Sequence, residues 1–324
     1  MKKFLYNQLI LFITKSSILV GGQAVIEGVM MRVPGFIATS VRNPQGDIVT
    51  RRREFTSLIH RDKRFNLPII RGAISLFEAM KIGFSTLQWS ADIAFPEEAN
   101  KQNKLMDFIM TIVSIFFALS LFIFLPLGLT SWFFNAEQDP IIFNILSGAM
   151  RISIFLIYLF IISKTKDAKR LFQYHGAEHK VVYAFENGDD LNVDNADKYP
   201  TQHPRCGTSF MFIVMLVAII SFIIIDRLFI EIFGSITLFN RFAMHILFIP
   251  LVSGLGYEIL KFSSQYKDNI ILKYFIKPGL WLQNITTNAP DSMQLEVSLD
   301  ALKSAFGDTL DDYHGKKHIA DAIG

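Results

Sequence analysis

The sequence predicts an all-α membrane protein in which four transmembrane helices form two hairpins, joined to a cytoplasmic cap that contains a small β-hairpin and amphipathic helices. The first observation is composition, since 51% of the 324 residues are hydrophobic and only 19% are charged, whereas soluble domains carry about 25% charged residues. The second is that the apolar residues are concentrated in a few long blocks. The third is that lysine and arginine fall mainly on segments outside these blocks.

Two features of the composition exclude whole classes of protein. The net charge of +3 is too small to indicate a nucleic-acid partner. A single cysteine excludes an internal disulfide. The chain is also too apolar to be disordered. We therefore expect a folded protein whose main partner is a lipid bilayer.

Four blocks are apolar and long enough to cross a bilayer, which needs about 20 such residues. They cover residues 105–134, 141–162, 209–225 and 242–260. Prolines inside such helices are tolerated when neighbouring groups satisfy the freed backbone.

The positive charges predict how these spans are oriented. Lysine and arginine gather in residues 1–104, in 163–208 and from Lys261 onward, while the connection 135–140 has none and 226–241 has only two. Because basic loops stay in the cytoplasm, both termini are expected there. The predicted organisation has five parts: a cytoplasmic N-terminal region (1–104), a first hairpin (105–162), a cytoplasmic segment (163–208), a second hairpin (209–260) and a cytoplasmic tail (261–324).

Several short patterns describe the cap. Residues 36–55 alternate in polarity around an Asn-Pro-Gln-Gly turn, which predicts a β-hairpin. Residues 69–94 predict an amphipathic helix that lies at the inner membrane surface or under the bundle, with a fifth span as the alternative. Residues 293–306 predict a second amphipathic helix. Residues 4–13 resemble a signal peptide but lack a cleavage site, so an interfacial or core helix is expected.

The glycine-rich segment 21–32 has two interpretations. It can be a turn into a short packed helix whose charges pair locally. Alternatively, Gln23, Glu27 or Arg32 belongs to a site, because charged groups in apolar surroundings need partners.

The segment Tyr174–Lys180 contains the residues best suited to chemistry. His175 and His179 are four residues apart, so a helix places both on one face as ligands of one Zn²⁺. Glu178 completes a His-x-x-Glu-His order, in which the glutamate acts as general base. Asn187–Gly188 then predicts the end of the helix.

A catalytic zinc needs a third protein ligand. The sequence offers several candidates on the same membrane side: Glu186, Asp189, Asp190, His203 and Cys206. If His203 and Cys206 both joined the two histidines, the site would be closed and structural. In the simplest alternative the histidines cap a helix or bind a phosphate headgroup, and Glu178 pairs with Lys180 or Lys164.

Other ionisable residues lie inside or at the ends of the predicted spans. Arg151, His245 and Glu258 could line a polar path, and Arg151 could pair with Glu258 or an anion. A helix–helix contact is the simpler interpretation. His314 and His318 have the spacing of metal ligands, but in a polar terminus we expect them to be exposed and idle.

The combination of motifs resembles the YqhQ-like family of bacterial integral membrane proteins. The motifs run from Gly21 to Arg32, at Arg71–Gly72, from His175 to Lys180, and from His203 to Phe210, with a matching end at Gln283–Thr287 and Asp291–Val297. The resemblance covers roughly residues 20–306. The segment before Gly21 is longer and more apolar than that family leads us to expect.

The resemblance implies a multi-pass protein of the bacterial inner membrane with a metal-dependent enzyme site, and it leaves the substrate open. By matching positions, it implies Zn²⁺ or another divalent metal at His175, His179, His203 and Cys206, with Glu178 as the catalytic residue. Gln23, Glu27, Arg32 and Arg205 follow as substrate-binding or supporting residues.

The leading hypothesis is a membrane hydrolase that acts at the cytoplasmic face, on a peptide or a lipid-linked substrate. The alternatives are a scaffold or assembly factor with a structural metal, and a small transporter or channel. No nucleic acid is expected as a partner, and association into an oligomer stays open.

Overall fold

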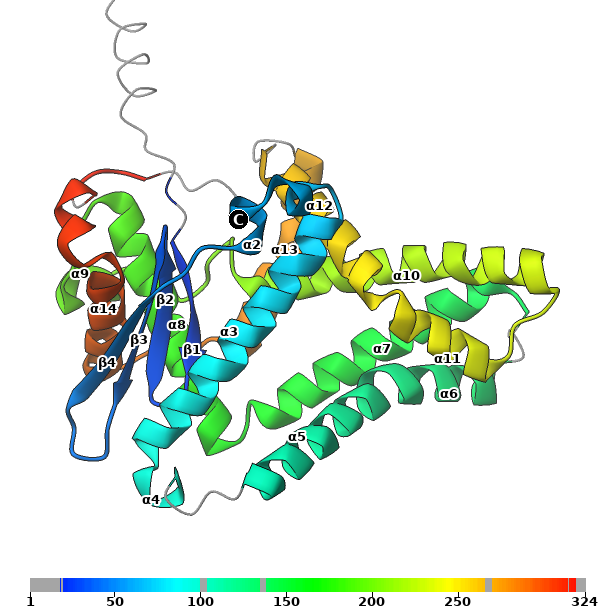
Figure 1. Cartoon of the computed structure of the whole chain (residues 1–324), viewed down its shortest axis with the longest axis horizontal. Helices are drawn as coiled ribbons and strands as arrows, with labels where there is room; N and C mark the ends of the chain where they lie inside the picture. The colour runs from blue at the N-terminus through cyan, green and yellow to red at the C-terminus, as the bar shows by residue number, and fades with distance from the viewer. Residues whose placement is uncertain are drawn as a thin grey trace, which may run out of the picture.

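A computed structural model describes residues 18, 20–99, 104–134, 138–265, 270–313 and 315–318. The described chain is mostly helical and contains one antiparallel sheet (Figure 1). The sheet and its covering helices form a cap, from which long apolar helices extend. The predicted helix at residues 4–13 lies outside the described residues.

The cap is built on a four-stranded sheet with strand order β1-β2-β3-β4. Its strands are β1 (Gly21–Val25), β2 (Gly28–Val33), β3 (Phe36–Arg42) and β4 (Ile48–Glu54). The last two confirm the predicted hairpin. The expectation of a short packed helix in residues 21–32 was wrong, because this segment forms β1 and β2 and doubles the sheet. The cap therefore contains a four-stranded sheet where a single small β-hairpin was expected.

Helices cover both faces of this sheet. On one face, α8 (Lys166–Asn187) and α14 (Ser292–Phe306) pack against side chains such as Val29 and Met31. On the other face, α3 (Ile70–Ala94) packs against Met30 and its neighbours. Successive residues of β2 therefore point into two different hydrophobic cores, one on each face of the sheet. The core that includes Val29 and Met31 also includes residues of α8 and holds this helix against the sheet.

The predicted helices at 69–94 and 293–306 are confirmed as α3 and α14. The cap also contains several short elements. They are α2 (Leu58–Arg61), η1 (Lys63–Asn66), α4 (Pro96–Ala99), α9 (Val193–Asp197) and η3 (Gly307–Asp312).

Three helical stretches are long and apolar enough to cross a membrane, and a bent pair makes a fourth if it counts as one span. The first joins α5 (Lys104–Leu119), a π-helical turn η2 (Ser120–Phe124) and α6 (Leu125–Phe133). The second is α7 (Pro140–Ile162) and the third is α10 (Gly207–Phe233). The bent pair is α11 (Leu238–Leu247) and α12 (Ile249–Gln265), with 53° between them.

Two of these differ from the sequence prediction. Helix α10 continues to Phe233, past the expected end at Ile225, because the carboxylate of Asp226 is bound inside the protein. The fourth segment is broken at Phe248, because Pro250 at the start of α12 has no N–H to continue the hydrogen bonding of α11.

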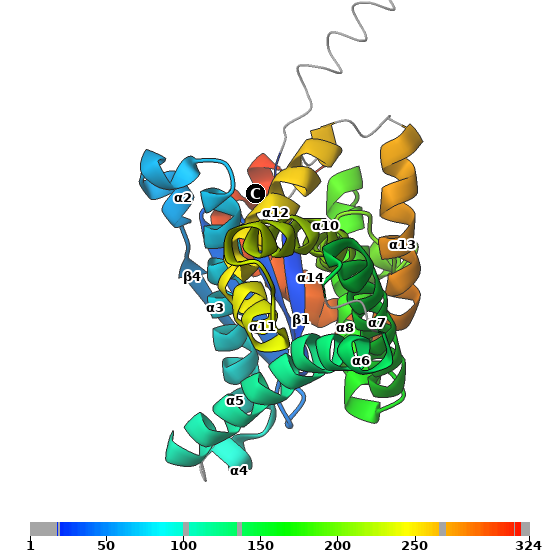
Figure 2. The ribbon, with the colours of Figure 1, turned by 90° about the vertical axis from the view of Figure 1, so that its right-hand side faces the viewer.

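The segment assigned to a tail begins with a packed helix, α13 (Ile270–Thr286), which lies against α10. Seen from the side, α3 and α13 flank α10 (Figure 2). A short connection leads from α13 to α14, and α14 packs against the sheet and α8 of the cap. This path brings the backbone near Thr286 next to α8.

Candidate metal centre

Helix α8 presents the two histidines on one face. His175 and His179 are one turn apart, with ring centroids 4.4 Å from each other. The hydroxyl of Thr165 caps the start of the helix by accepting the N–H of Ala168 at 3.3 Å. Gly188, with φ of 75°, ends it. The predicted helix and its C-terminal cap are therefore confirmed.

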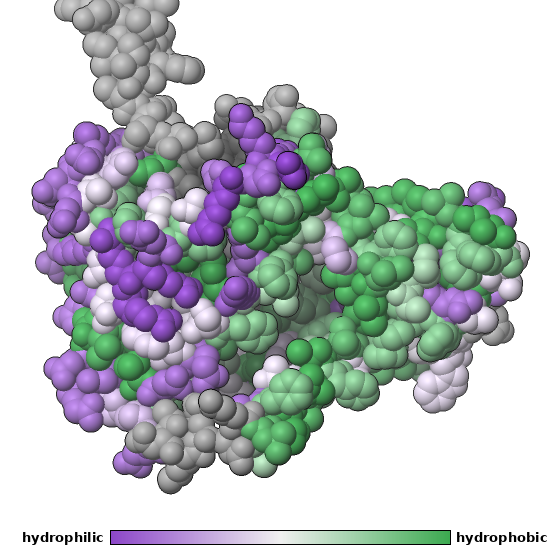
Figure 3. Space-filling model, in the orientation of Figure 1, coloured by the Kyte–Doolittle hydropathy of each residue, from purple (hydrophilic) through white to green (hydrophobic). Residues whose placement is uncertain are grey.

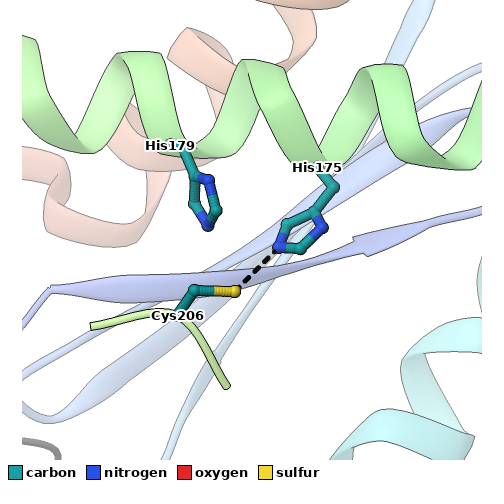
Figure 4. A group of neighbouring side chains, drawn as sticks. All are labelled: His175, His179 and Cys206. Atoms are coloured by element: carbon teal, nitrogen blue, oxygen red, sulfur yellow. Dashed lines mark hydrogen bonds between the residues drawn. The ribbon is translucent and has the colours of Figure 1, made fainter. Parts of the chain in front are cut away.

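The cysteine of the chain lies opposite these rings. Cys206 is the N-cap of α10, and its sulfur lies 3.2 Å from Nε2 of His175. Both rings point from α8 toward this sulfur (Figure 4). The candidate ligand atoms of His175, His179 and Cys206 lie within 4.8 Å of one another. We call these three residues the His-His-Cys group.

The second ring nitrogen of each histidine faces a backbone carbonyl. Nδ1 of His175 donates to the carbonyl oxygen of Thr286 at 2.8 Å, and Nδ1 of His179 donates to that of Thr201. Because a carbonyl oxygen can only accept, each Nδ1 carries the ring proton, and each Nε2 keeps its lone pair. Metal-binding histidines are commonly oriented in this way.

The backbone beyond α13 can reach α8 because residue 176 is a glycine. A methyl group there would lie 2.1 Å from the carbonyl oxygen of Asn288. The N–H of Asn288 in turn donates to the carbonyl of Phe172 at 2.9 Å. Gly176, next to His175 in the motif, therefore allows the end of α13 and the residues after it to lie close to α8. The carbonyl of Thr286, which accepts from His175, belongs to this segment.

Glu178 lies beside the His-His-Cys group. Its Oε2 is 3.5 Å from Nε2 of His179, and the side chain is almost fully buried. Burial raises the pKa of Glu178, while nearby His175 and the backbone N–H of Gly22 act in the opposite direction. Lys180, a suggested partner, instead binds the side chain and carbonyl of Asp197.

His203 lies next to the group rather than within it. Its ring centroid is 5.6 Å from that of His179 and 4.4 Å from that of Tyr183. Its Nε2 is 3.5 Å from a carboxylate oxygen of Glu186, which also pairs with Arg205. Burial lowers the pKa of His203 and of Arg205. Metal binding by His203 therefore stays a prediction.

One residue that positions the loop was missed by the sequence analysis. The amide of Gln283 in α13 accepts the N–H of His203 at 2.7 Å and donates to its carbonyl at 2.8 Å. Gln283 is fully buried. It belongs to a family motif, which was the available signal, but its residue type gave no indication of this role. Thr201 and Thr286 were also missed because they contribute only backbone carbonyls.

The three candidates of the 21–32 segment lie on the sheet. Gln23 faces Gly83 of α3, and Arg32 lies over the ring of Phe55 at 4.7 Å. Glu27, at the β1–β2 turn, pairs with Arg170 of α8. Burial lowers the pKa of Arg32. These contacts join the sheet to α3 and α8 and place Arg32 against the residue that follows β4, and the predicted binding roles stay predictions.

The ionisable residues of the apolar helices form separate contacts. Glu258 pairs with Arg71 and not with Arg151, which was one of the possibilities raised by the sequence. Arg151 instead donates from Nε to the carbonyl of Phe122 at 3.0 Å. His245 lies 3.3 Å from a carboxylate oxygen of Asp226. A polar path that includes Arg151, His245 and Glu258 stays a prediction.

The end of the described chain also differs from expectation. His318 is buried, its ring stacks on that of Phe185 at 4.7 Å, and its Nε2 lies 2.7 Å from the carbonyl oxygen of Tyr313. The expectation that it is exposed was wrong. His314 lies outside the described residues.

Comparison with known proteins gives one family and one relative. Residues 67–308 match a family described as protein of unknown function (DUF1385). An uncharacterized protein of Bacillus subtilis (strain 168), YqhQ, is 28% identical over 307 residues, which cover 87% of this chain and 90% of the relative. No solved structure matches the chain.

Proposed function

We propose that this chain, which belongs to the DUF1385 family of YqhQ-like proteins of unknown function, is a metal-dependent hydrolase of the membrane surface. In this proposal the His-His-Cys group holds Zn²⁺ or another divalent metal. Glu178 is the general base. The substrate is a peptide or a lipid-linked molecule that reaches the site from the membrane.

The observation that carries the proposal is the arrangement of the two imidazoles. Both Nδ1 atoms are committed to carbonyl oxygens, of Thr286 and Thr201. Both Nε2 lone pairs therefore face the sulfur of Cys206, and a cation that displaced the thiol proton could bind between them. Two neutral imidazoles and a thiolate are a donor set that suits zinc, with three protein ligands and room for one more.

The surroundings of Cys206 supply hydrogen-bond donors to its sulfur. The sulfur lies at the N-terminus of α10, where the backbone N–H of Thr208 is 3.5 Å away and its hydroxyl is 3.3 Å away. The same sulfur lies 3.2 Å from Nε2 of His175, so the thiol and this ring are placed to bind one cation.

Glu178 is suited to accept a proton during hydrolysis. A divalent metal in such a site acidifies a coordinated water molecule and polarises the oxygen of the bond to be cleaved. Burial raises the pKa of Glu178, which brings this carboxylate closer to the working pH of a general base. The N–H of Gly22 holds the carboxylate in place beside His179.

The proposal places the site at the cytoplasmic face of the inner membrane. Cys206 immediately precedes α10, whose residues from Met211 are apolar enough to cross a bilayer. The basic segments and both termini would lie in the cytoplasm by the distribution of lysine and arginine. A substrate carried in the membrane could therefore reach the site without leaving the membrane.

A scaffold or assembly factor with a structural metal is the second candidate. The observation that favours it is the 3.5 Å between Oε2 of Glu178 and Nε2 of His179. If Glu178 became the fourth ligand, the metal would have no position left for water, and such closed sites are structural.

The first experiment measures metal content in detergent-purified protein. We expect about one zinc ion per chain, and we expect His179→Ala to lose it. His60→Ala is the matched control, because His60 is exposed and lies in α2, outside the site. Wild-type protein without metal after purification in zinc-containing buffer would overturn the proposal.

The second experiment separates the enzyme from the scaffold. Wild type and Glu178→Gln are incubated with solubilised membrane extract in ¹⁸O-labelled water, and the products are examined by mass spectrometry. We expect Glu178→Gln to keep the metal and to lose products that contain ¹⁸O. Equal ¹⁸O incorporation by wild type and Glu178→Gln, or no incorporation by either, would contradict the hydrolase. Loss of the metal in Glu178→Gln would identify Glu178 as a ligand.

A further inference from the structure

Helix α3 has three different faces, and the sheet and α12 cover one of them. Its packed face carries buried residues at helical spacing: Ile82, Thr86, Ser90 and Ala94. A second face carries apolar side chains exposed to solvent, which are Phe77 (68% exposed), Met80 (51%), Phe84 (62%) and Leu87 (36%). The third face is polar and includes Lys81, Ser85 and Gln88.

The spacing shows that the exposed apolar side chains form one stripe. They follow each other at intervals of three or four residues, which place side chains on the same side of a helix. The sheet and α12 cover the face that carries the buried residues, and they leave this stripe exposed. The second apolar face of α3 is therefore available for something outside the described chain.

The segment before α3 adds positive charge to this surface. Three basic residues are exposed there: Arg61, Lys63 and Arg64. Exposed apolar residues lie on either side of them in the sequence: Leu58, Phe65 and Leu67. The acidic residue of this segment, Asp62, caps η1, and its carboxylate accepts the N–H of Arg64 at 2.9 Å. The outer surface thus combines cations with apolar side chains.

A glutamate fixes this segment to α3. The carboxylate of Glu78 accepts the hydroxyl of Ser57 at 2.6 Å and the backbone N–H of Leu58 at 2.7 Å. The basic segment is therefore held at a defined place beside the apolar stripe, near the N-terminal end of the helix. Both parts belong to one surface.

The orientation of α3 suits a position in the plane of a membrane. Figure 1 shows α3 running across the direction of α10 at the junction between the cap and the apolar helices. Figure 3 shows hydrophobic surface that continues from α3 toward these helices, with a hydrophilic region near α2. A bilayer that surrounds α10 would therefore meet α3 from its apolar side.

We propose that α3 and residues 58–67 form an in-plane anchor that binds the anionic leaflet of the membrane. Phe77, Met80, Phe84 and Leu87 lie among the acyl chains, and Arg61, Lys63 and Arg64 bind the phosphates of anionic lipids. Helices with this composition bind at the headgroup level through buried apolar area and basic residues. The anchor rests on the membrane location in the proposed function, and it does not depend on the metal.

Charge decides between lipid and protein as the partner. A protein surface that covered α3 would have to supply acidic groups beside an apolar groove. The cytoplasmic leaflet supplies negative charge next to hydrocarbon in any case. Lys81 borders the apolar stripe and can extend its amine toward the headgroups while its stem stays apolar.

The test places a fluorescent NBD label at residue 84 of the full chain. Phe84→Cys is compared with Ser85→Cys, whose side chain points about 100° further round the helix. Both carry Cys206→Ser, so that labelling is confined to the new cysteine. In phosphatidylglycerol vesicles with brominated acyl chains, we expect several-fold stronger quenching at 84 than at 85. Equal quenching at the two positions would overturn the anchor.

The charged part of the anchor is tested separately. Phe84→Cys is combined with Arg61→Gln, Lys63→Gln and Arg64→Gln, and quenching is measured in phosphatidylglycerol and in phosphatidylcholine vesicles. We expect the preference of the parent protein for phosphatidylglycerol to disappear in the combined variant. An unchanged preference would contradict binding by these three cations.

The outcomes also separate this proposal from the membrane location itself. Protein that does not float with vesicles in a density gradient would disprove both. Protein that floats while residue 84 stays accessible to aqueous iodide would disprove the anchor alone. A label at 84 that is protected from iodide but is not quenched by brominated lipid would indicate that protein covers α3, which also overturns the anchor.

Discussion

The backbone of Gly22 lies directly against the side chain of Glu178. A methyl group on Gly22 would come within 2.9 Å of Cγ of Glu178 and within 2.4 Å of the carbonyl oxygen of Met30. Strand β1 and helix α8 are therefore held together at the residue proposed as general base. The glycine is required by this close approach, because the obstructing atoms include backbone of β2.

Gly22→Ala is expected to destabilise the cap by about 1–3 kcal/mol, which is typical of overpacking in a buried region. The measurement is the midpoint of thermal unfolding of the purified protein. Gly21→Ala is the control, because a methyl group on Gly21 would meet no atom of the described chain within 4 Å. Equal midpoints for the two variants would show that β1 moves freely relative to α8.

Zinc should stabilise the folded protein through the His-His-Cys group. At a free zinc concentration about 100 times the Kd, the free energy of unfolding should rise by about 2.7 kcal/mol. His179→Ala should abolish this increase, and His60→Ala should keep it. The measurement is thermal unfolding after chelation, with and without added zinc. An equal increase in His179→Ala would place the zinc elsewhere.

Asp226→Asn is expected to lower the free energy of unfolding by about 3–5 kcal/mol, the cost of breaking a buried ion pair. The carboxylate of Asp226 accepts Nε of Arg241 at 2.7 Å and the amide of Asn144 at 2.7 Å, and both ionic side chains are fully buried. Asparagine keeps the shape but removes the charge. Unfolding in detergent measures the effect.

The next residue provides the control for this variant. Arg227 is 67% exposed and pairs only with Glu231, one turn further along the helix, among the contacts described for it. Arg227→Gln is expected to change the free energy of unfolding by less than about 0.5 kcal/mol. A similar loss in both variants would mean that the helix, and not the buried pair, is sensitive to substitution.

The raised pKa of Tyr199 predicts that the free energy of unfolding falls at alkaline pH. Its hydroxyl donates to Asp189 at 2.6 Å, and burial together with this bond raises the pKa of Tyr199 to about 12. A raised pKa in the folded protein favours the neutral phenol, so this contribution is complete below pH 10 and is lost as the pH rises through about 12. Between these values, wild type should lose stability more steeply than Tyr199→Phe in thermal unfolding. Parallel curves would contradict the prediction.

Sequence patterns found the β3–β4 hairpin but not the first half of the sheet. The turn at Asn43–Gly46 has residues that specify it, and the strands beside it alternate in polarity. Strand β2 is buried on both faces, so its residues are apolar almost throughout, and no period of two is visible. A two-sided strand and a packed helix look alike at this length.

The apolar helices were predicted because length and hydropathy suffice to identify them. Their ends were harder, since a charged residue normally marks the end of a span. Helix α10 continues past Asp226 because Arg241, His245 and Asn144 bind its carboxylate inside the protein. These three partners lie on other helices. Tertiary pairing of this kind has no signature in the local sequence.

In the candidate site, the helical spacing of His175 and His179 was enough to place them together. Cys206 was one of several third ligands that the sequence could not rank, because the loop that brings it back is positioned by Gln283 from a distant helix. Backbone carbonyls that orient the rings cannot be predicted from residue types at all.

Helix α10 begins beside the sulfur of Cys206 and carries Asp226 about 30 Å further along its axis. This separation equals the thickness of the hydrocarbon layer of a typical bilayer, about 30 Å. A straight rod fixed by polar contacts at both ends responds to a thinner layer by tilting. In a membrane of short-chain lipids, the tilt would change the distance between the sulfur and the imidazoles, so the affinity of the proposed metal site would depend on bilayer thickness.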